Sequence, residues 1–204
     1  MSNIRVTYAG LISLAIRLSS IITGLIFVLI TTRELTQNEF GTWGVISGIF
    51  IYAIAIHPTI TYWATREIAR GEETGKTVFL SSSMFSIVGI LIYVGVALFV
   101  SFESDAELGI LLFAAILVPM IFLNDSLTSI ALGSKPQVIS YGFLSFEVSK
   151  ILLAFLFVYF MQMGLEGAIL ATFGAYIPSI FIMGIKVRHR LQNSIQKEYV
   201  KKWI

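Results

Sequence analysis

The sequence predicts an all-α protein that crosses a membrane several times, and two observations indicate this. The 204 residues have a mean hydropathy of +0.86. Only 13% of the residues are charged, whereas soluble domains carry about 25%. Such a deficit of charge points to lipid as the solvent of most side chains.

Six apolar stretches are long enough to cross a membrane, since a helical span needs about 20 mostly apolar residues. Short polar joints separate them, so we expect a single six-helix transmembrane domain over residues 1–186. Because six is an even number, both ends of the domain are expected on the same side. The predicted spans cover residues 9–31, 42–63, 78–101, 108–132, 141–161 and 166–186.

Lysine and arginine predict the orientation of these spans. One set of flanks carries eleven of them, and the opposite set carries only Arg33. Because positive residues favour the cytoplasmic side, we expect a multi-pass protein of the cell membrane with both termini in the cytoplasm. The eleven are Arg5, Arg66, Arg70, Lys76, Lys135, Lys186, Arg188, Arg190, Lys197, Lys201 and Lys202.

Residues 187–204 form a different kind of segment. Apolar or aromatic residues recur there every four positions, and Lys and Arg fill much of the remainder. This pattern is typical of a basic amphipathic helix on the inner membrane surface. A cytoplasmic connector into further structure explains it equally well. The recurring residues are Val187, Leu191, Ile195, Tyr199 and Trp203.

Four ionisable side chains interrupt the expected spans: Arg17, Asp125, Glu147 and Lys150. A charge in hydrocarbon costs at least about 2.5 kcal/mol on insertion scales, so it usually faces a polar interior or a partner. With a helical rise of about 1.5 Å per residue, all four lie roughly 9–14 Å from the cytoplasmic edge. His57, near the inner end of its span, joins that layer.

Small and polar residues accompany two of these charges. Arg17 and Ser20 share one face of the first span, and Asn124 extends a polar patch around Asp125. We expect these faces to line a cavity. Its candidate substrate-binding residues are Arg17, Lys150, Asp125, Glu147, Asn124 and Ser20, with His57 as a secondary candidate.

Each candidate also has a purely structural explanation. Arg17 can snorkel to the interface, and Glu147 can neutralise Lys150, because the two are spaced i and i+3. Asp125 can cap a kink or pair with Arg17. His57 can be a satisfied packing residue beside a proline. The sequence leaves both explanations open for every one of them.

The motifs of common enzyme classes are absent from the sequence. There is no Cys, only two His, and no H-E-x-x-H helix, so neither a disulfide framework nor a zinc hydrolase is expected. The run Gly71–Thr77 ends in G-K-T, but its first glycine is one residue too close for a phosphate-binding loop. We expect no catalytic residue, metal or cofactor, and the net charge of +2 does not indicate nucleic acid.

Three segments resemble one protein family, in the same order along the chain. Residues 30–43, ITTRELTQNEFGTW, resemble the first outer loop of prokaryotic polysaccharide flippases. Residues 62–76 resemble the basic loop after helix 2 of these proteins. Residues 164–172, GLEGAILAT, resemble the segment that opens helix 6. The family belongs to the multidrug/oligosaccharidyl-lipid/polysaccharide exporter superfamily.

The resemblance implies a function. Such flippases move a polyprenyl-linked oligosaccharide across the cytoplasmic membrane, through a cationic cavity between two lobes that rock to alternate access. Arg17 matches an arginine often found on the cavity face of helix 1. Members have about 12 to 14 spans, so this chain resembles one N-terminal six-helix lobe. We expect the second lobe on a missing part of the sequence or on a separate chain.

The leading hypothesis is a transporter without enzymatic activity, whose partners are a lipid-linked glycan, membrane lipids and a second lobe. Arg17 and Lys150 would bind the substrate phosphate, and Asp125 and Glu147 would hold these cations in its absence. One alternative is a cation-coupled multidrug exporter with Asp125 or Glu147 as its ion site. Another is a non-transporting assembly subunit whose buried charges contact partner helices.

Overall fold

The chain forms a helical bundle. The computed structural model describes residues 6–104, 106–192, 194–196, 198–199 and 203, and within α1 it leaves out the side chains of residues 6–13 and 15–17. All regular structure in these ranges is helical, as expected. The elements are α1 (Val6–Glu34), α2 (Gln37–Ala53), α3 (His57–Ala69), α4 (Gly75–Glu103), α5 (Leu108–Ala114), α6 (Leu117–Ser134), α7 (Gln137–Ala154), the π-helix η1 (Phe155–Phe160) and α8 (Gly164–Leu191).

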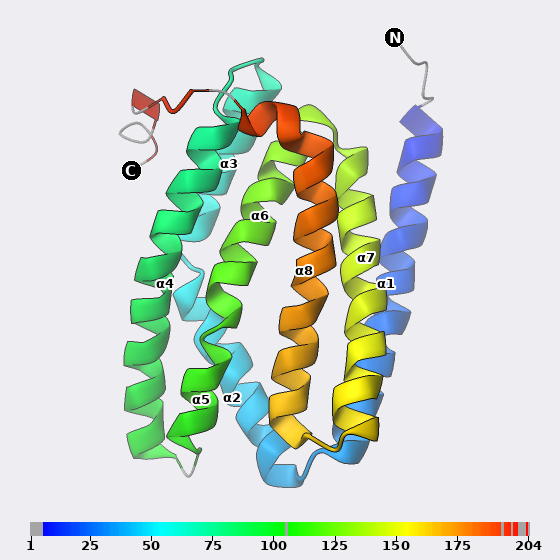
Figure 1. Ribbon diagram of the computed structural model, residues 1–204, viewed down its shortest axis with the longest axis vertical. Coiled ribbons are helices and arrows are strands. Elements are labelled where there is room, and N and C mark those ends of the chain that lie inside the picture. The colour runs from blue at the N-terminus through cyan, green and yellow to red at the C-terminus, as the bar shows by residue number, and fades with distance from the viewer. Residues whose placement is uncertain (1–5, 105, 193, 197, 200–202, 204) are drawn as a thin grey trace.

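The helices run between the two ends of the bundle (Figure 1). The start of α1, the α3–α4 and α6–α7 turns and the end of α8 lie together at what we call the basic end. The α1–α2, α4–α5 and η1–α8 turns lie at the other, the acidic end. The basic end carries Arg66, Arg70, Lys76, Lys135, Lys186, Arg188 and Arg190 together with Glu67, Glu72 and Glu73. The acidic end carries Glu34, Glu39, Glu103, Glu107 and Glu166 together with Arg33.

Four segments of the described chain are long and apolar enough to span a membrane: 75–103, 108–134, 137–160 and 164–191. The pair α2 and α3 makes a fifth if the two helices form one bent span. By length and composition, the described helices therefore account for four or five of the six predicted spans. The predicted first span corresponds to α1, which has 29 residues and is not among these segments.

The predicted continuous span 42–63 is broken. α2 ends at Ala53, α3 begins at His57, and their axes differ by 55°. Pro58 explains the break, because proline lacks an N–H and its ring clashes with the carbonyl four residues earlier. The His57 N–H instead donates to the Ile54 carbonyl at 3.0 Å, a tighter turn. Pro119 stands just after a similar break between α5 and α6.

Two apolar clusters fill the bundle, one toward each end. The cluster toward the acidic end includes Ala53, Phe122 and Ala154. The cluster toward the basic end includes Ile60, Leu127 and Val138 as well as Trp203 from the tail. α6 passes between α3, α4 and α8 and contributes to both clusters.

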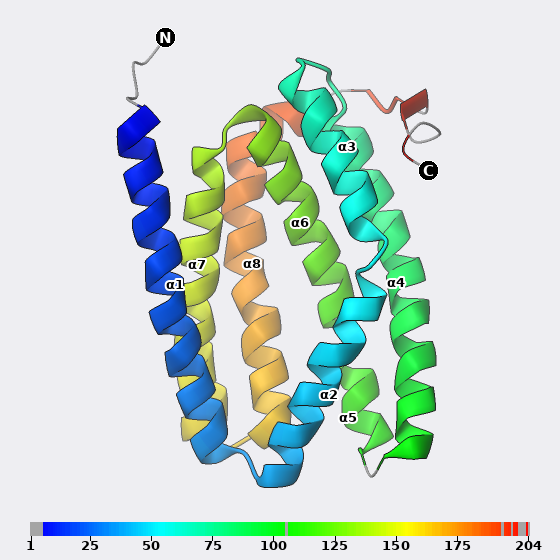
Figure 2. The same ribbon diagram turned by 180° about the vertical axis from the view of Figure 1, so that it is seen from behind.

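α1 and α3 diverge toward the basic end, and α6, α7 and α8 lie between them (Figure 2). α1 packs mainly on α7, and α3 packs mainly on α6.

The tail turns back at the basic end. α8 ends at Leu191, and the Gln196 N–H donates to the Thr77 hydroxyl at 2.9 Å. The Tyr199 phenol donates a hydrogen bond to the Glu72 carboxylate. This bond is the main reason why the pKa of Tyr199 is raised, and burial raises it further. These contacts attach the described part of the tail to the α3–α4 turn.

The acidic end is closed by a contact between distant turns. Thr36 caps α2 in a capping box with Glu39, and the Glu39 carboxylate also accepts the Leu165 N–H at 3.1 Å. Gly164 has a positive φ of 55° there, and a side chain on it would collide with Glu39. The α1–α2 turn is thereby joined to the start of α8.

Candidate functional site

A belt of polar side chains crosses the bundle between the two apolar clusters. On α6, for example, Asn124 and Asp125 fall between Phe122 of one cluster and Leu127 of the other. The structure thus brings together most of the residues that depth along the helices placed in one layer. We call this set the polar belt; its members are Thr23, His57, Ser82, Asn124, Asp125, Glu147, Lys150, Tyr176 and Ser179.

Glu147 and Lys150 form an ion pair on α7. Lys150 Nζ lies 3.1 Å from Glu147 Oε2 and 3.2 Å from Oε1. The Thr23 hydroxyl on α1 donates to Glu147 Oε2 at 2.7 Å. The two charged side chains are only 9% and 14% exposed. The mutual pairing considered from their i, i+3 spacing is therefore present, and it also joins α1 to α7.

Aromatic rings enclose the Lys150 ammonium. Its Nζ lies 5.4 Å from the ring centroid of Phe27 and 5.0 Å from that of Phe146. Rings at such distances attract a cation through their negative faces. The ammonium is thus held by one carboxylate and two rings, and it lines neither of the pockets beside Asp125.

Asp125 on α6 faces His57 at the start of α3. Asp125 Oδ2 lies 3.6 Å from His57 Nδ1, and the other ring nitrogen, Nε2, lies 3.2 Å from the Ser82 hydroxyl oxygen on α4. The His57 ring packs on Phe122 at 4.2 Å between centroids. His57 is 2% exposed, whereas the Asp125 side chain is 46% exposed. The imidazole thus connects a buried hydroxyl to an accessible carboxylate.

The order Ser82, His57, Asp125 is that of a hydrolase triad, but its setting differs. A nucleophilic serine must reach a substrate carbonyl. Ser82 is fully buried and lines neither pocket beside Asp125. Within the described part of the chain, no group of three or more His, Cys, Asp or Glu could hold a metal ion. This arrangement is suited to proton exchange and ion pairing.

α8 completes the belt. The Ser179 hydroxyl donates to the Asn124 side-chain oxygen at 2.9 Å. One turn earlier, the Tyr176 ring packs on Phe146 at 4.7 Å between centroids. The carboxylates of Asp125 and Glu147 both act electrostatically on the Tyr176 phenol. Tyr176 therefore lies between the two halves of the belt.

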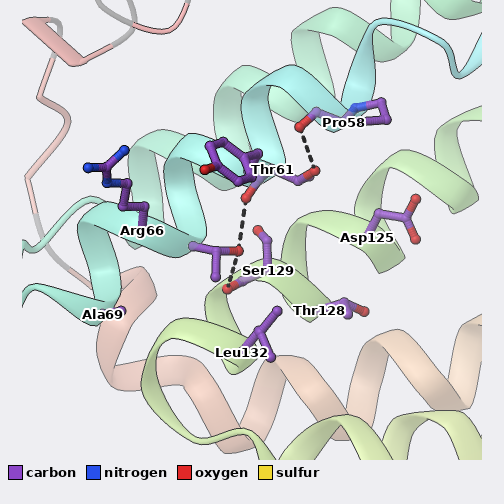
Figure 3. Close-up of a pocket in the computed structure, with 10 residues that line it drawn as sticks. Pro58, Thr61, Arg66, Ala69, Asp125, Thr128, Ser129 and Leu132 are labelled. Carbon is purple, nitrogen blue, oxygen red and sulfur yellow. Dashed lines mark hydrogen bonds between the residues drawn. The ribbon is translucent and has the colours of Figure 1, made fainter.

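A pocket of about 610 Å³ is lined by residues of α3 and α6, and we call it the α3–α6 pocket. Asp125 and Pro58 lie at its inner end, and Arg66 and Ala69 lie at the other, toward the basic end (Figure 3). Hydrocarbon makes up most of the wall, and hydroxyl groups are set into it. The hydroxyl-bearing residues are Thr61, Tyr62, Thr65, Thr128 and Ser129.

A second pocket of about 270 Å³ lies on the other side of α6, against α7 and α8. Asp125 and Thr128 line both pockets. Asn124, Tyr176 and Ser179 of the polar belt line the second one. Asp125 is thus the charged residue that the two pockets share.

Two predicted residues belong to α1. Arg17 lies within α1, but its side chain is outside the described part, so its predicted cavity position stays a prediction. The Ser20 carbonyl accepts a hydrogen bond from the Thr23 hydroxyl at 3.0 Å. Ser20 therefore lies one turn from the Glu147–Lys150 pair.

Sequence reasoning missed Thr23, Ser82, Tyr176 and Ser179. Hydroxyl residues are common in membrane helices, so none of the four stands out by composition. One signal was present: Ser82 and Ser86 lie one turn apart on the same buried face of α4. Tyr176 carries no such signal, because its position between two carboxylates depends on how α6, α7 and α8 pack.

Comparisons with known proteins do not add a relative. No family model matches the chain, and neither a curated protein nor a solved structure matches it.

Proposed function

We propose that this chain forms one six-helix lobe of a membrane transporter that moves a polyprenyl-linked oligosaccharide across the cytoplasmic membrane. Its spans would be the five segments described above together with α1. The termini would be cytoplasmic, because the basic end would face the cytoplasm. A second lobe would complete the cavity, on further sequence or on a separate chain.

The α3–α6 pocket is the observation that supports this proposal most. A lipid-linked sugar needs hydrogen-bonding groups for its hydroxyls and an apolar wall for its lipid. The pocket offers hydroxyl oxygens as acceptors in a mostly hydrocarbon wall. The hydroxyl protons of its Thr and Ser residues are donated to backbone carbonyls of their own helices. Arg66 stands at the end nearest the basic turns, and an arginine there suits a phosphate, which it can bind through two hydrogen bonds.

The Glu147–Lys150 pair has a place in the same proposal. A substrate phosphate would have to compete with Glu147 for the Lys150 ammonium. Without substrate, the carboxylate keeps that buried cation neutralised. Arg17 would be the other cation, as the resemblance to flippases implies.

Binding of a labelled substrate tests the proposal. The full chain is placed in lipid nanodiscs and titrated with a fluorescent polyprenyl-pyrophosphate oligosaccharide. We expect Arg66→Ala to weaken binding about tenfold or more, since a hydrogen bond to a charged group contributes about 1.5–3 kcal/mol. Arg33→Ala, at the acidic end, is the matched control and should leave binding unchanged.

Two results would contradict the proposal. One is equal affinity for the polyprenyl phosphate without its sugar, which would leave the pocket hydroxyls without a role. The other is an Arg66→Ala variant that binds as the wild type does. Arg17→Ala in the same assay tests the role carried over to Arg17.

One observation favours the cation-coupled multidrug exporter as a second candidate. Asp125 is half exposed and lines two pockets, and its ion-pair partner among the described side chains is His57. Such a carboxylate suits a sodium ion or a proton. Sodium- or proton-dependent binding of a cationic dye, lost in Asp125→Asn, would favour this candidate over the flippase. The assembly-subunit alternative predicts that neither ligand binds.

A further inference from the structure

His57 combines a buried position with a location at a break in the backbone. It is 2% exposed and packs on the Phe122 ring. It is also the first residue of α3, directly after the 55° bend that separates α3 from α2. A change of charge on this ring would therefore act where the backbone is not held by continuous helical hydrogen bonds.

The two ring nitrogens of His57 have different surroundings. Nε2 lies 3.2 Å from the Ser82 hydroxyl oxygen, which can donate to a bare nitrogen or accept from an N–H. Nδ1 lies 3.6 Å from Asp125 Oδ2, which is too long for a good hydrogen bond. In a neutral ring, Ser82 satisfies Nε2, and Nδ1 faces Asp125 across the longer distance. An imidazolium has two donors and would need the Asp125 carboxylate as well.

Asp125 also provides a route for a proton. Its side chain is 46% exposed and lies at the inner end of the α3–α6 pocket. A proton that enters the pocket reaches Asp125 first and then the buried ring behind it. Histidine suits this task, because its ordinary charge change falls between about pH 5 and pH 8.

Few other ionisable groups face this position among the described residues. Asp125 of α6 is the ionisable residue that pairs with the His57 ring. α4 presents the neutral Ser82 hydroxyl, and α3 itself adds Tyr62 and Arg66 along the same pocket. The remaining ionisable residues of the helices packed on α3 near this level are the buried Tyr93 of α4 and the exposed Tyr52 of α2.

We propose that His57 is a proton-binding site, and that proton uptake draws α3 toward α6 through the His57–Asp125 pair and narrows the α3–α6 pocket. The idea rests on the proposed transport function, for which the proton would be the coupling ion. Deprotonation would release Asp125 from this pair and widen the pocket.

Histidine NMR tests the proton site. The chain has two histidines, so His189→Gln leaves His57 as the single signal in the full chain in nanodiscs. We expect both ring nitrogens to become protonated as the pH falls from about 8 to about 5. Asp125→Asn should weaken proton binding about tenfold or more, because the imidazolium loses its carboxylate. A ring that stays neutral over this range, or one unaffected by Asp125→Asn, would overturn the proposal.

The movement is measured by spin labels, which the absence of cysteine makes specific. Labels at Thr59→Cys on α3 and Leu144→Cys on α7 report the distance between two helices on opposite sides of α6 (Figure 2); both positions are exposed. We expect a shorter distance at about pH 5.5 than at about pH 8, with the change lost in His57→Gln and kept in His189→Gln. A shift that persists in His57→Gln, or no shift in the wild type, contradicts the coupling.

The two proposals fail separately. If labelled glycan does not bind but His57 titrates and α3 moves, the proton site stands and the flippase function falls. If glycan binds at both pH values while His57 does not titrate, the flippase function stands and the proton site falls. Asp125→Asn keeps the histidine, so it remains informative if His57→Gln does not fold.

Discussion

At the scale of single residues, the main result concerns which charges pair. Lys150 is held by Glu147 and by two aromatic rings, and the Thr23 hydroxyl satisfies the same carboxylate. Charges removed from water are tolerated when they are paired and hydrogen-bonded. The pair therefore removes much of the cost of placing two charges inside an apolar bundle, and it joins α1 to α7.

Breaking this pair should destabilise the protein. Glu147→Gln leaves the Lys150 ammonium buried without its counter-charge, so we expect a loss of about 3 kcal/mol in the free energy of unfolding. Adding Lys150→Met to that variant should restore most of the loss. Denaturant unfolding in mixed micelles measures both values. Lys186→Met, an exposed position near the basic end, is the control, and an equal loss there would rule out burial as the cause.

At the scale of elements, close approach of helices decides the geometry of the α3–α6 pocket. Gly133 of α6 lies so near α3 that an added Cβ would stand 2.8 Å from the Thr65 carbonyl oxygen and 2.9 Å from Ile68 Cβ. The Thr65 hydroxyl donates to the Ser129 carbonyl at 3.3 Å across the same contact. Small residues let membrane helices approach in this way.

Gly133→Ala should push α3 away from α6. Because backbone is among the atoms in the way, we expect a loss of about 1–3 kcal/mol in stability and weaker glycan binding at the distorted pocket. Thermal unfolding and the nanodisc binding assay provide the two measurements. Gly95→Ala on α4 has nothing within 4 Å of its added Cβ and should leave both unchanged. Equal effects at the two glycines would show that loss of flexibility, not crowding, is responsible.

At the scale of the whole molecule, the opposite charges of the two ends predict the orientation. The basic end gathers turns that are far apart in the sequence, and the acidic end gathers the turns between them (Figure 1). Positive residues near short loops favour the cytoplasm, whereas acidic residues contribute little to orientation. The bundle as a whole therefore carries one consistent signal.

Labelling of single cysteines in intact cells checks that orientation. Asn38→Cys in the first turn of α2 and Glu73→Cys in the α3–α4 turn are both exposed positions at opposite ends. We expect a membrane-impermeant maleimide to label Asn38→Cys directly, and Glu73→Cys only after permeabilisation. The parent protein has no cysteine and serves as the blank. The reverse labelling pattern would invert the proposed topology.

Hydropathy along the chain determined much of the fold before any contact was known. It predicted a helical membrane protein and located the apolar helices, because apolar length is a local property of the sequence. Counting residues along each helix also predicted that Asp125, Glu147, Lys150 and His57 share one depth, since the helical rise is constant. The structure pairs His57 with Asp125 and Glu147 with Lys150.

Only the tertiary structure decided which of them touch. Spacing allowed Glu147 to pair with Lys150 or to stay free for a substrate, and it allowed Asp125 to pair with Arg17. Among the described side chains, the packing of α3 against α6 places His57 beside Asp125. Partners across helices depend on the rotation of each helix and on the size of bends such as the one after Ala53. Pro58 marks the position of that bend in the sequence, but its angle of 55° and the helix rotations arise only when the helices pack.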